Sequence, residues 1–144
     1  MLTTSLIHTL LIFIFTLTPK ADDILGVWLT ADEDGHVEIF EENGKFFGKI
    51  IWAEDMYEDD GVTLSKDNNN PDSELRERTI KNLVIIEDFV FENGEWRNGN
   101  IYDPNNGRTY SARMRLRDGK LHLRGYIGFS MIGRTEVWTR LETD

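Results

Sequence analysis

The sequence predicts an all-β protein: a single antiparallel up-and-down β-barrel of about eight strands, with one long polar loop and one short helical turn. Three observations predict this fold. From Ile24 onward the chain consists of short alternating or apolar runs, hairpin-forming residues stand between most of them, and no long segment has helical periodicity. Strands that follow one another in hairpin order favour an up-and-down barrel.

The predicted strands span residues 24–30, 36–42, 45–53, 83–92, 96–103, 108–118, 120–128 and 134–141. Asn43-Gly44 and Asp118-Gly119 stand between neighbouring strands, and these residue types tolerate the positive φ of tight hairpin turns. We expect the barrel interior to be either filled by side chains or just wide enough for one small ligand.

The strand at 45–53 is apolar on both faces. Alternation places Phe46, Ile50 and Trp52 on one face. Phe47 and Ile51 fall on the other face. This pattern predicts a strand that is covered on both sides, with the long loop packed outside it.

The last strand alternates between two faces of different chemistry. One face carries Val137, Thr139 and Leu141. The other face carries an indole among charged side chains, namely Arg134, Glu136, Trp138 and Arg140. Each of these arginines therefore lies within reach of the Trp138 indole, and a strand of this kind suits the closing edge of a barrel.

The connection from 54 to 82 is long and polar, and loops of this length are usually functional or disordered. We expect Asp72 or Ser73 to cap a short helical turn over 74–77. The segment 67–72 is rich in Asp and Asn, which are calcium-binding residue types, but it lacks the spacing and glycine of an EF-hand loop. We favour turn formation around Pro71, with Arg76 tied to the barrel by a carboxylate, and predict no metal.

Residues 1–21 have the character of a cleaved signal peptide. The apolar run at 6–17 is about 12 residues long, whereas a membrane span needs about 20. Ala21 offers a small residue at the cleavage point, although no Lys or Arg precedes the apolar run. We therefore expect an exported protein, periplasmic or extracellular and not membrane-spanning, with one barrel domain at 22–144.

Composition excludes several functions. The net charge of −10 becomes −11 without residues 1–21, whose only charged side chain is Lys20, and such an acidic chain should repel nucleic acid. The absence of cysteine excludes disulfides, thiol nucleophiles and thiolate metal sites. His36 and His122 lie on separate predicted strands, and no serine has a nucleophile-elbow motif. We predict no catalytic residue and no cofactor.

Short motifs along the whole domain, taken together, resemble one bacterial family. They include Gly26-x-Trp28, Asn70-Pro71-Asp72 and Tyr102-Asp103. The complete set of matching signature positions is Gly26, Trp28, Asn70, Pro71, Asp72, Arg76, Tyr102, Asp103, Gly125, Gly133, Arg134, Trp138 and Arg140. These residues resemble the family catalogued as domain of unknown function 2147. The resemblance implies a small exported bacterial protein of lipocalin-like (calycin) shape without an established biochemical role. Asn82 departs from the family pattern, where glycine is expected.

Gly26-x-Trp28 is also similar to the start of lipocalin and fatty-acid-binding barrels. That resemblance implies that the Trp28 indole closes the barrel bottom and that an arginine near the chain end stacks on it. Such a cation-π contact is worth about 0.5 to 2 kcal/mol. We expect Arg140 to be this partner, with Arg134 as the second candidate.

The leading functional hypothesis is a non-enzymatic binding or envelope accessory module. Its ligand would be small and apolar or amphipathic, bound near the turn at 127–132 by Arg124, Tyr126, Phe129, Met131 and Ile132. For the turn itself we favour a plug that folds over the barrel mouth; the alternative is a small apolar contact site for a ligand or partner. Two alternatives are a hydrolase of a cell-envelope polymer, acting through carboxylates of the acidic loop such as Asp67 and Asp72, and a partner-binding structural module with a filled barrel. The protein partner is not identified.

One further surface is predicted on the barrel exterior. Arg113, Arg115 and Arg117 share one face of a strand, beside His122 and Arg124 on the next strand. We expect these cations to pair with Asp or Glu across strands; the alternative is a basic patch that holds a phosphate or an acidic polymer.

Overall fold

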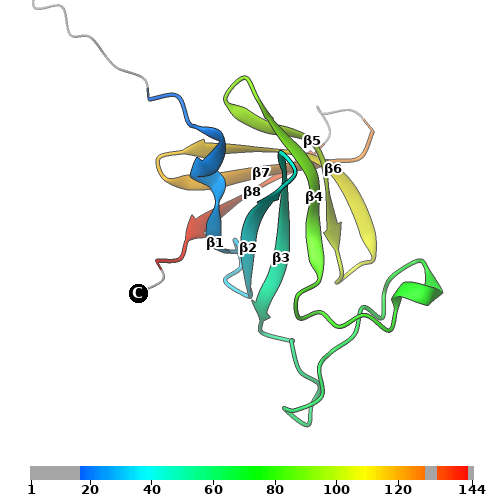
Figure 1. Cartoon of the computed structure of the whole chain (residues 1–144). Coiled ribbons are helices and arrows are strands. Elements are labelled where there is room, and N and C mark those ends of the chain that lie inside the picture. Colours follow the sequence, from blue (N-terminus) through cyan, green and yellow to red (C-terminus); the bar gives the residue numbers. More distant parts are fainter. Residues whose placement is uncertain (1–16, 129–132, 143–144) are drawn as a thin grey trace, which may run out of the picture.

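Eight antiparallel strands pair in sequence order and close into a barrel in residues 17–128 and 133–142, which the computed structural model describes (Figure 1). The strands are β1 (Gly26–Leu29), β2 (Gly35–Glu42), β3 (Lys45–Ala53), β4 (Val84–Glu92), β5 (Glu95–Asp103), β6 (Arg108–Arg117), β7 (Lys120–Tyr126) and β8 (Gly133–Arg140). The predicted fold class is confirmed. The first strand is shorter than the predicted 24–30, because Ile24 belongs to the 3-10 helix η1 (Ala21–Ile24), Leu25 follows that helix and Thr30 lies beyond β1.

Tight hairpins join β2 to β3, β4 to β5 and β6 to β7. Their turn residues have positive φ, as in Asn43 (52°) with Gly44 (78°) and Asp118 (51°) with Gly119 (72°). This backbone twist matches the twist of the flanking strands, so the turns fix the register locally. Asn82 also has positive φ (64°), which explains why glycine suits that position.

Trp28 closes one end of the barrel, as predicted. Its indole is fully buried and donates a hydrogen bond to the Ile24 carbonyl at 2.9 Å. The guanidinium carbon of Arg140 lies 4.2 Å from the centre of the Trp28 ring, and Arg140 Nη1 donates to the Leu25 carbonyl at 2.7 Å. A Cβ atom on Gly26 would lie 2.9 Å from that nitrogen. Arg140 is therefore the stacking partner, and the glycine gives it room.

The seam that closes the barrel is short. Strands β1 and β8 are paired only at Trp28 with Arg140 and at Leu29 with Thr139, whereas β2 and β3 pair along their whole length. The two hydrogen bonds from Arg140 to the carbonyls of Leu25 and Asp23 extend this seam beyond the ladder. The Leu141 amide still donates to the Val27 carbonyl at 2.9 Å, and before β1 begins the Arg140 side chain takes over from main-chain pairing.

The closed half of the barrel is densely packed. The ring of Phe89 covers Gly99 so closely that a Cβ atom there would lie 2.1 Å from it. Trp96 is fully buried beside these residues, and its indole donates to the Ala21 carbonyl at 3.2 Å. Met114 and Leu121 complete this packing with no exposed surface. The helix η1 therefore seals the barrel end together with the indoles.

A β-bulge corrects the prediction for Trp52. The register between β2 and β3 shifts at His36/Val37, so Ile50 pairs with Val37 whereas Trp52 pairs with His36. One extra residue reverses the side-chain alternation. Trp52 consequently lies on the outer surface, 41% exposed, with its ring 4.6 Å from that of His36. It does not share the inward face of Phe46 and Ile50.

The long connection from 54 to 83 leaves the open end of the barrel, at the lower edge of the view in Figure 1. Asp72 Oδ1 caps the 3-10 helix η2 (Ser73–Leu75) by accepting from the Glu74 amide at 3.0 Å, as predicted. The prediction for Arg76 is wrong, since its Nε donates to the Asn70 carbonyl at 2.7 Å, and the ion pair with a carboxylate is made by Arg78.

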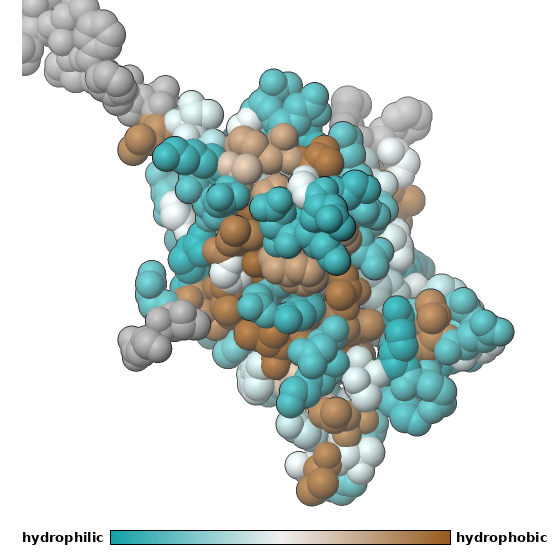
Figure 2. All heavy atoms as spheres, viewed as in Figure 1, coloured by the Kyte–Doolittle hydropathy of each residue, from teal (hydrophilic) through white to brown (hydrophobic). Residues whose placement is uncertain are grey.

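Apolar side chains are exposed on this loop. Val62 is 78% exposed and Tyr57 is 46% exposed. Figure 2 shows hydrophobic atoms at the lower tip of the molecule, where the loop ends. Within the described ranges, no helix has the length and apolar character required to cross a membrane.

Candidate binding cavity

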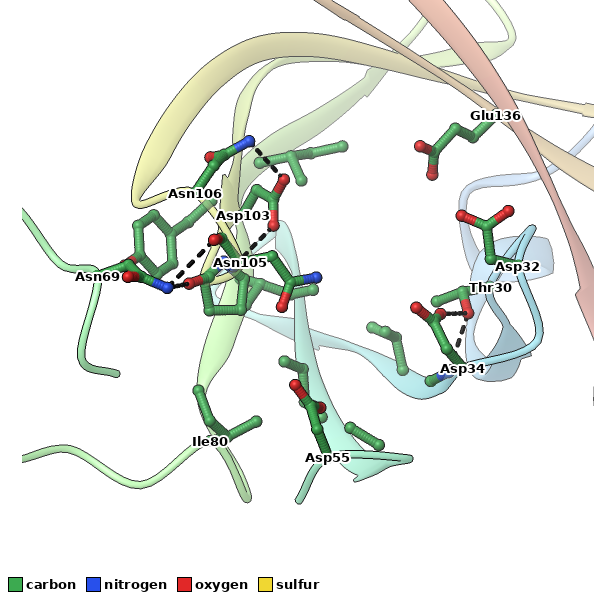
Figure 3. Close-up of a pocket in the computed structure, with 18 of the residues that line it drawn as sticks. Thr30, Asp32, Asp34, Asp55, Asn69, Ile80, Asp103, Asn105, Asn106 and Glu136 are labelled. Carbon is green, nitrogen blue, oxygen red and sulfur yellow. Dashed lines mark hydrogen bonds between the residues drawn. The ribbon is translucent and has the colours of Figure 1, made fainter. Parts of the chain in front are cut away.

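A cavity of about 970 Å³ occupies the open half of the barrel (Figure 3). Its inner wall is made of apolar side chains from several strands, including Val37, Ile50, Ile85, Ile101, Leu123 and Trp138. Binding pockets for small molecules are typically about 300–1,000 Å³ with mostly apolar walls. The barrel is therefore filled at its closed end and hollow at its mouth; that the hollow half holds a small ligand stays a prediction.

Strand β8 contributes a charged group to the inner wall. Glu136 is paired with Leu123 across the β7–β8 ladder, so it shares the inward face with this buried leucine. Its carboxylate accepts from the Trp138 indole at 3.3 Å and lies 3.5 Å from Arg134 Nη2. This arrangement confirms the predicted alternation along the last strand.

Polar groups from three connections surround the mouth. On one side, Thr30 donates its hydroxyl hydrogen to Asp34 Oδ1 at 2.6 Å and accepts from the Gly35 amide, next to Asp32. Figure 3 shows Glu136 on this same side. The opposite side carries the turn between β5 and β6, with Asp103, Asn105 and Asn106, and the Asn69 side chain.

The β5–β6 turn is ordered by its own side chains. Asp103 accepts from the Asn105 amide at 2.9 Å and from the Asn106 side chain at 2.8 Å. The Asn69 side-chain amide donates to the carbonyls of Pro104 and Asn105. A Cβ atom on Gly107 would lie 1.9 Å from the Asn69 carbonyl oxygen, so only glycine permits this approach. The long loop is thus docked directly against the turn.

Asp67 holds the docked loop to the barrel. Its side chain is fully buried and accepts hydrogen bonds from Tyr102 at 2.5 Å, Asn70 at 2.8 Å and Arg78 at 2.9 Å. Burial, together with the hydrogen bond to the Asp67 carboxylate and its negative charge, raises the pKa of Tyr102 to about 12. The signature residues Asn70, Asp72 and Tyr102 therefore fix the loop at the cavity mouth.

Only part of the predicted ligand-binding set lies at the cavity. Tyr126 lines the cavity, as do the neighbouring Ile127 and Arg134. Arg124 lies outside the lining and donates to the Thr135 hydroxyl at 3.3 Å. Phe129, Met131 and Ile132 lie outside the described residues, so their predicted role stays a prediction. Among the other signature residues, Gly125 and Gly133 also line the cavity, and a Cβ atom on Gly133 would collide with the Gly125 carbonyl at 2.4 Å.

Cations face one another on the exterior of β6 and β7. The cross-strand pairs are Arg113 with Arg124, Arg115 with His122 and Arg117 with Lys120. The expected cross-strand pairing with an acid is confirmed for Arg115, and the acid comes from the other neighbouring strand: Glu95 of β5 lies 2.5 Å from Arg115 and 3.1 Å from Arg97. Burial alone would raise the pKa of Glu95, but its hydrogen bonds to the two guanidinium groups outweigh burial and lower it.

The carboxylates singled out for hydrolysis serve the loop structure. Asp67 is surrounded by the donors described above, and Asp72 caps η2. In the part of the chain that the structure describes, no group of three or more His, Cys, Asp or Glu side chains is arranged to hold a metal ion.

The sequence profile of one family matches residues 26–140, which is the whole barrel from the start of β1 to the end of β8. This family is described as "Uncharacterized protein conserved in bacteria (DUF2147)". The chain belongs to this family. Among curated proteins, none matches the chain.

A solved structure supports the same fold. The DUF2147 barrel described here is similar to protein HP1028 from the human pathogen Helicobacter pylori, which is described as belonging to the lipocalin family. The two chains share 29% sequence identity, the match covers 82% of each chain, and the TM-score is 0.70. The lipocalin-like barrel is therefore shared with a member of the lipocalin family.

Sequence reasoning missed most of the mouth. Asp32, Asp34 and Asp55 come from two separate connections, and each is an ordinary acid in a polar turn when viewed in the sequence; Asp103, at the end of β5, was recognised only as a signature residue. Their one common signal is position, because the β1–β2, β3–β4 and β5–β6 connections all lie at the same end of an up-and-down barrel. The inward position of Glu136, in contrast, could be predicted from the alternation of side chains along the last strand.

Proposed function

We propose that this protein is a binding protein that holds a small, largely apolar or amphipathic molecule in the open half of its barrel, without catalysing a reaction. The observation that carries the proposal is the cavity of about 970 Å³ with an apolar wall. A barrel of eight strands that was simply stabilised by its core would be filled along its length. The lipocalin-like fold is compatible with a binding module.

The wall and the mouth differ in chemistry, which supports an amphipathic ligand. Ile85 and Leu123 are almost fully buried in the wall, whereas Asp32 and Asp34 are exposed at the mouth. A molecule with an apolar body would gain van der Waals contact with the side chains of the wall, which are already shielded from bulk water. Its polar end would remain at the mouth, where hydrogen-bonding groups and water are available.

Native mass spectrometry tests this proposal. The protein is purified gently from its own host, and its native mass is compared with that of the denatured chain. We expect a co-purifying mass that is lost in Leu123→Trp, whose indole would occupy the cavity, and retained in the surface variant Glu87→Gln. A native mass equal to that of the bare chain, together with no binding of apolar probes by calorimetry, would overturn the proposal.

We also propose that residues 1–21 are removed on export and that the protein acts in the periplasm or outside the cell as an envelope accessory. N-terminal sequencing of the protein from its host tests this, with Asp22 as the expected first residue. Cleavage after Ala21 would remove the carbonyl that accepts from the Trp96 indole, whereas a mature chain that starts at or before Ala21 would keep this bond and would place the cleavage point earlier than proposed. An uncleaved chain recovered from the cytoplasm contradicts the proposal.

A further inference from the structure

We propose that the ligand is a cationic amphiphile: an apolar chain or ring system that carries an amine or a quaternary ammonium group. This inference rests on the proposed function and adds the charge of the ligand. The cavity defines the site, and the charged groups that line it define which ligand fits. Fatty acids, which carry a carboxylate on a similar chain, are predicted to be poor ligands.

The lining carries a large excess of negative charge. Seven of the lining side chains are carboxylates, namely Asp32, Asp34, Asp55, Glu58, Asp59, Asp103 and Glu136. Only two lining side chains, Lys66 and Arg134, are cationic. An asymmetry of this size gives the cavity a negative potential and concentrates cations in it.

Both cations of the lining are already neutralised by acids. Lys66 Nζ lies 2.5 Å from a Glu77 carboxylate oxygen. Arg134 Nη2 lies 3.5 Å from Glu136 Oε1. In contrast, no ion pair with Lys or Arg within residues 17–128 and 133–142 involves Asp32, Asp34, Asp55 or Asp103. Asp34 and Asp103 already accept hydrogen bonds from Thr30, Asn105 and Asn106, so Asp32 and Asp55 are the two carboxylates of this set that are left to interact with a ligand.

The carboxylates surround the mouth rather than one wall of it. Figure 3 shows Asp32, Asp34 and Glu136 along one side, Asp103 on the opposite side, and Asp55 at the lower edge between them. A positive group at the centre of the mouth would be attracted from several directions. A ligand carboxylate at the same place would be repelled by all of them, which costs free energy that apolar contact must offset.

Glu136 extends this preference into the cavity. Because it shares the inward face with Leu123 and Trp138, its carboxylate lies at the border between the charged mouth and the apolar wall. A bound amine would share this carboxylate with Arg134 Nη2, 3.5 Å from Oε1, and with the Trp138 indole, while its apolar chain contacts the wall. Charge at this border acts in a partly water-excluded environment, where electrostatic interactions are stronger than in bulk water.

Isothermal titration calorimetry with three probes of equal chain length tests the inference. Dodecylamine is cationic, dodecanol is neutral and dodecanoate is anionic, and all are used below the concentration at which they aggregate. We expect dodecylamine to bind about tenfold or more tightly than dodecanoate, with dodecanol between them. Added salt should reduce the difference between dodecylamine and dodecanoate and leave dodecanol affinity nearly unchanged.

Two variants that each remove one carboxylate test whether the cavity mouth causes the preference for a cationic ligand. Glu136→Gln and Asp32→Asn should each weaken dodecylamine binding several-fold and leave dodecanol binding in place. Glu87→Gln removes one charge from the exposed outer surface of β4, so it is the charge-matched control and should not change the preference. A loss of preference in Glu87→Gln equal to that in Glu136→Gln would overturn the assignment to the mouth.

The outcomes separate this inference from the proposed function. If dodecanol binds and dodecylamine shows no advantage over dodecanoate, the cavity binds apolar molecules and the inference on charge is wrong. If dodecanoate binds most tightly, the inference is likewise overturned. If none of the three probes binds, the proposed function fails as well.

Discussion

Trp28 and Arg140 form one packed unit at the closed end of the barrel. Trp28→Ala should lower the free energy of unfolding by about 3 to 5 kcal/mol, because the indole is fully buried. Arg140→Ala should cost less. In the Trp28→Ala background the cost of Arg140→Ala should shrink further, since the two side chains touch. Urea unfolding of the four proteins of the cycle measures this coupling, and strictly additive losses would contradict it.

Tyr102 donates the shortest of the hydrogen bonds to the buried Asp67 carboxylate. Tyr102→Phe removes this bond to a charged group and should destabilise the protein by roughly 1.5 to 3 kcal/mol. Because the folded pKa of Tyr102 is raised from 10.0 to about 12, its stabilisation is complete below pH 10 and is lost as the pH rises towards 12. Thermal unfolding of both proteins across this range should therefore show the difference narrowing only at the alkaline end.

Hydrogen exchange distinguishes a local from a global effect of Tyr102→Phe. Amides in 54–82 should exchange faster, while those in β5 and β6 near the closed end should be protected as before. Uniformly faster exchange throughout the barrel would contradict the assignment of Tyr102 to loop docking.

For individual side chains, the sequence predicted which residues are structurally important more successfully than it predicted which residues they contact. Asn70, Asp72 and Tyr102 were recognised through family resemblance, and Trp28 with Arg140 through the Gly-x-Trp pattern. The contact of Asp67 with Tyr102 joins residues that are 35 positions apart, and patterns of neighbouring residues in the sequence do not predict contacts over that separation. The sequence also could not show that Arg78, and not Arg76, pairs with the carboxylate, because both arginines are within reach of the same turn.

The β6–β7 ladder places like charges directly opposite each other, since Arg113 is paired with Arg124. Like charges in directly opposite positions destabilise a sheet, whereas opposite charges stabilise it by about 0.2 to 1 kcal/mol. Arg113→Glu should therefore raise the unfolding free energy by an amount in that range. Chemical unfolding at low ionic strength measures it.

The same strand contains a matched control for Arg113→Glu. Arg108 lies opposite Asp103 in the β5–β6 ladder, so Arg108→Glu exchanges the same residues but creates a like-charge pair. This variant should be destabilised. If both substitutions shift stability in the same direction, overall charge rather than cross-strand pairing controls the effect.

Element boundaries were predictable where turn chemistry is local. Asn-Gly and Asp-Gly turns specify hairpins by their own φ angles, and the ends of β3 coincide with the prediction. The orientation of Trp52 was not predictable, because the bulge at His36/Val37 results from pairing between two strands. Alternation holds within a strand only until such a bulge occurs.

The barrel has a filled half and a hollow half, and β7 places one leucine in each half. Leu121 is fully buried in the filled half, whereas Leu123 lines the cavity. Leu123→Trp should therefore change the free energy of unfolding little, because the larger ring enters empty space. Leu121→Trp should cost about 1 to 3 kcal/mol through overpacking. Thermal unfolding compares them, and equal losses would show that the cavity closes in solution.

The division into two halves was beyond the sequence. Apolar alternation along β7 is the same at Leu121 and Leu123, so the residues themselves do not indicate which one faces empty space. The difference arises from the opposing wall, where Trp28, Phe89 and Trp96 gather at one end only. Side-chain volume at a given height of a barrel is summed over strands that are far apart in the chain.

The short seam between β1 and β8 affects the order in which the strands of a newly made chain pair. Arg140 contacts the Leu25 carbonyl across 115 positions, so this bond forms only after almost the entire chain has left the ribosome. The hairpins from β2 to β7 involve near neighbours and can assemble earlier. Until β8 arrives, β1 exposes an unpaired edge that another nascent chain is able to occupy. The final strand therefore sets the length of the interval during which newly made copies are vulnerable to swapping strands.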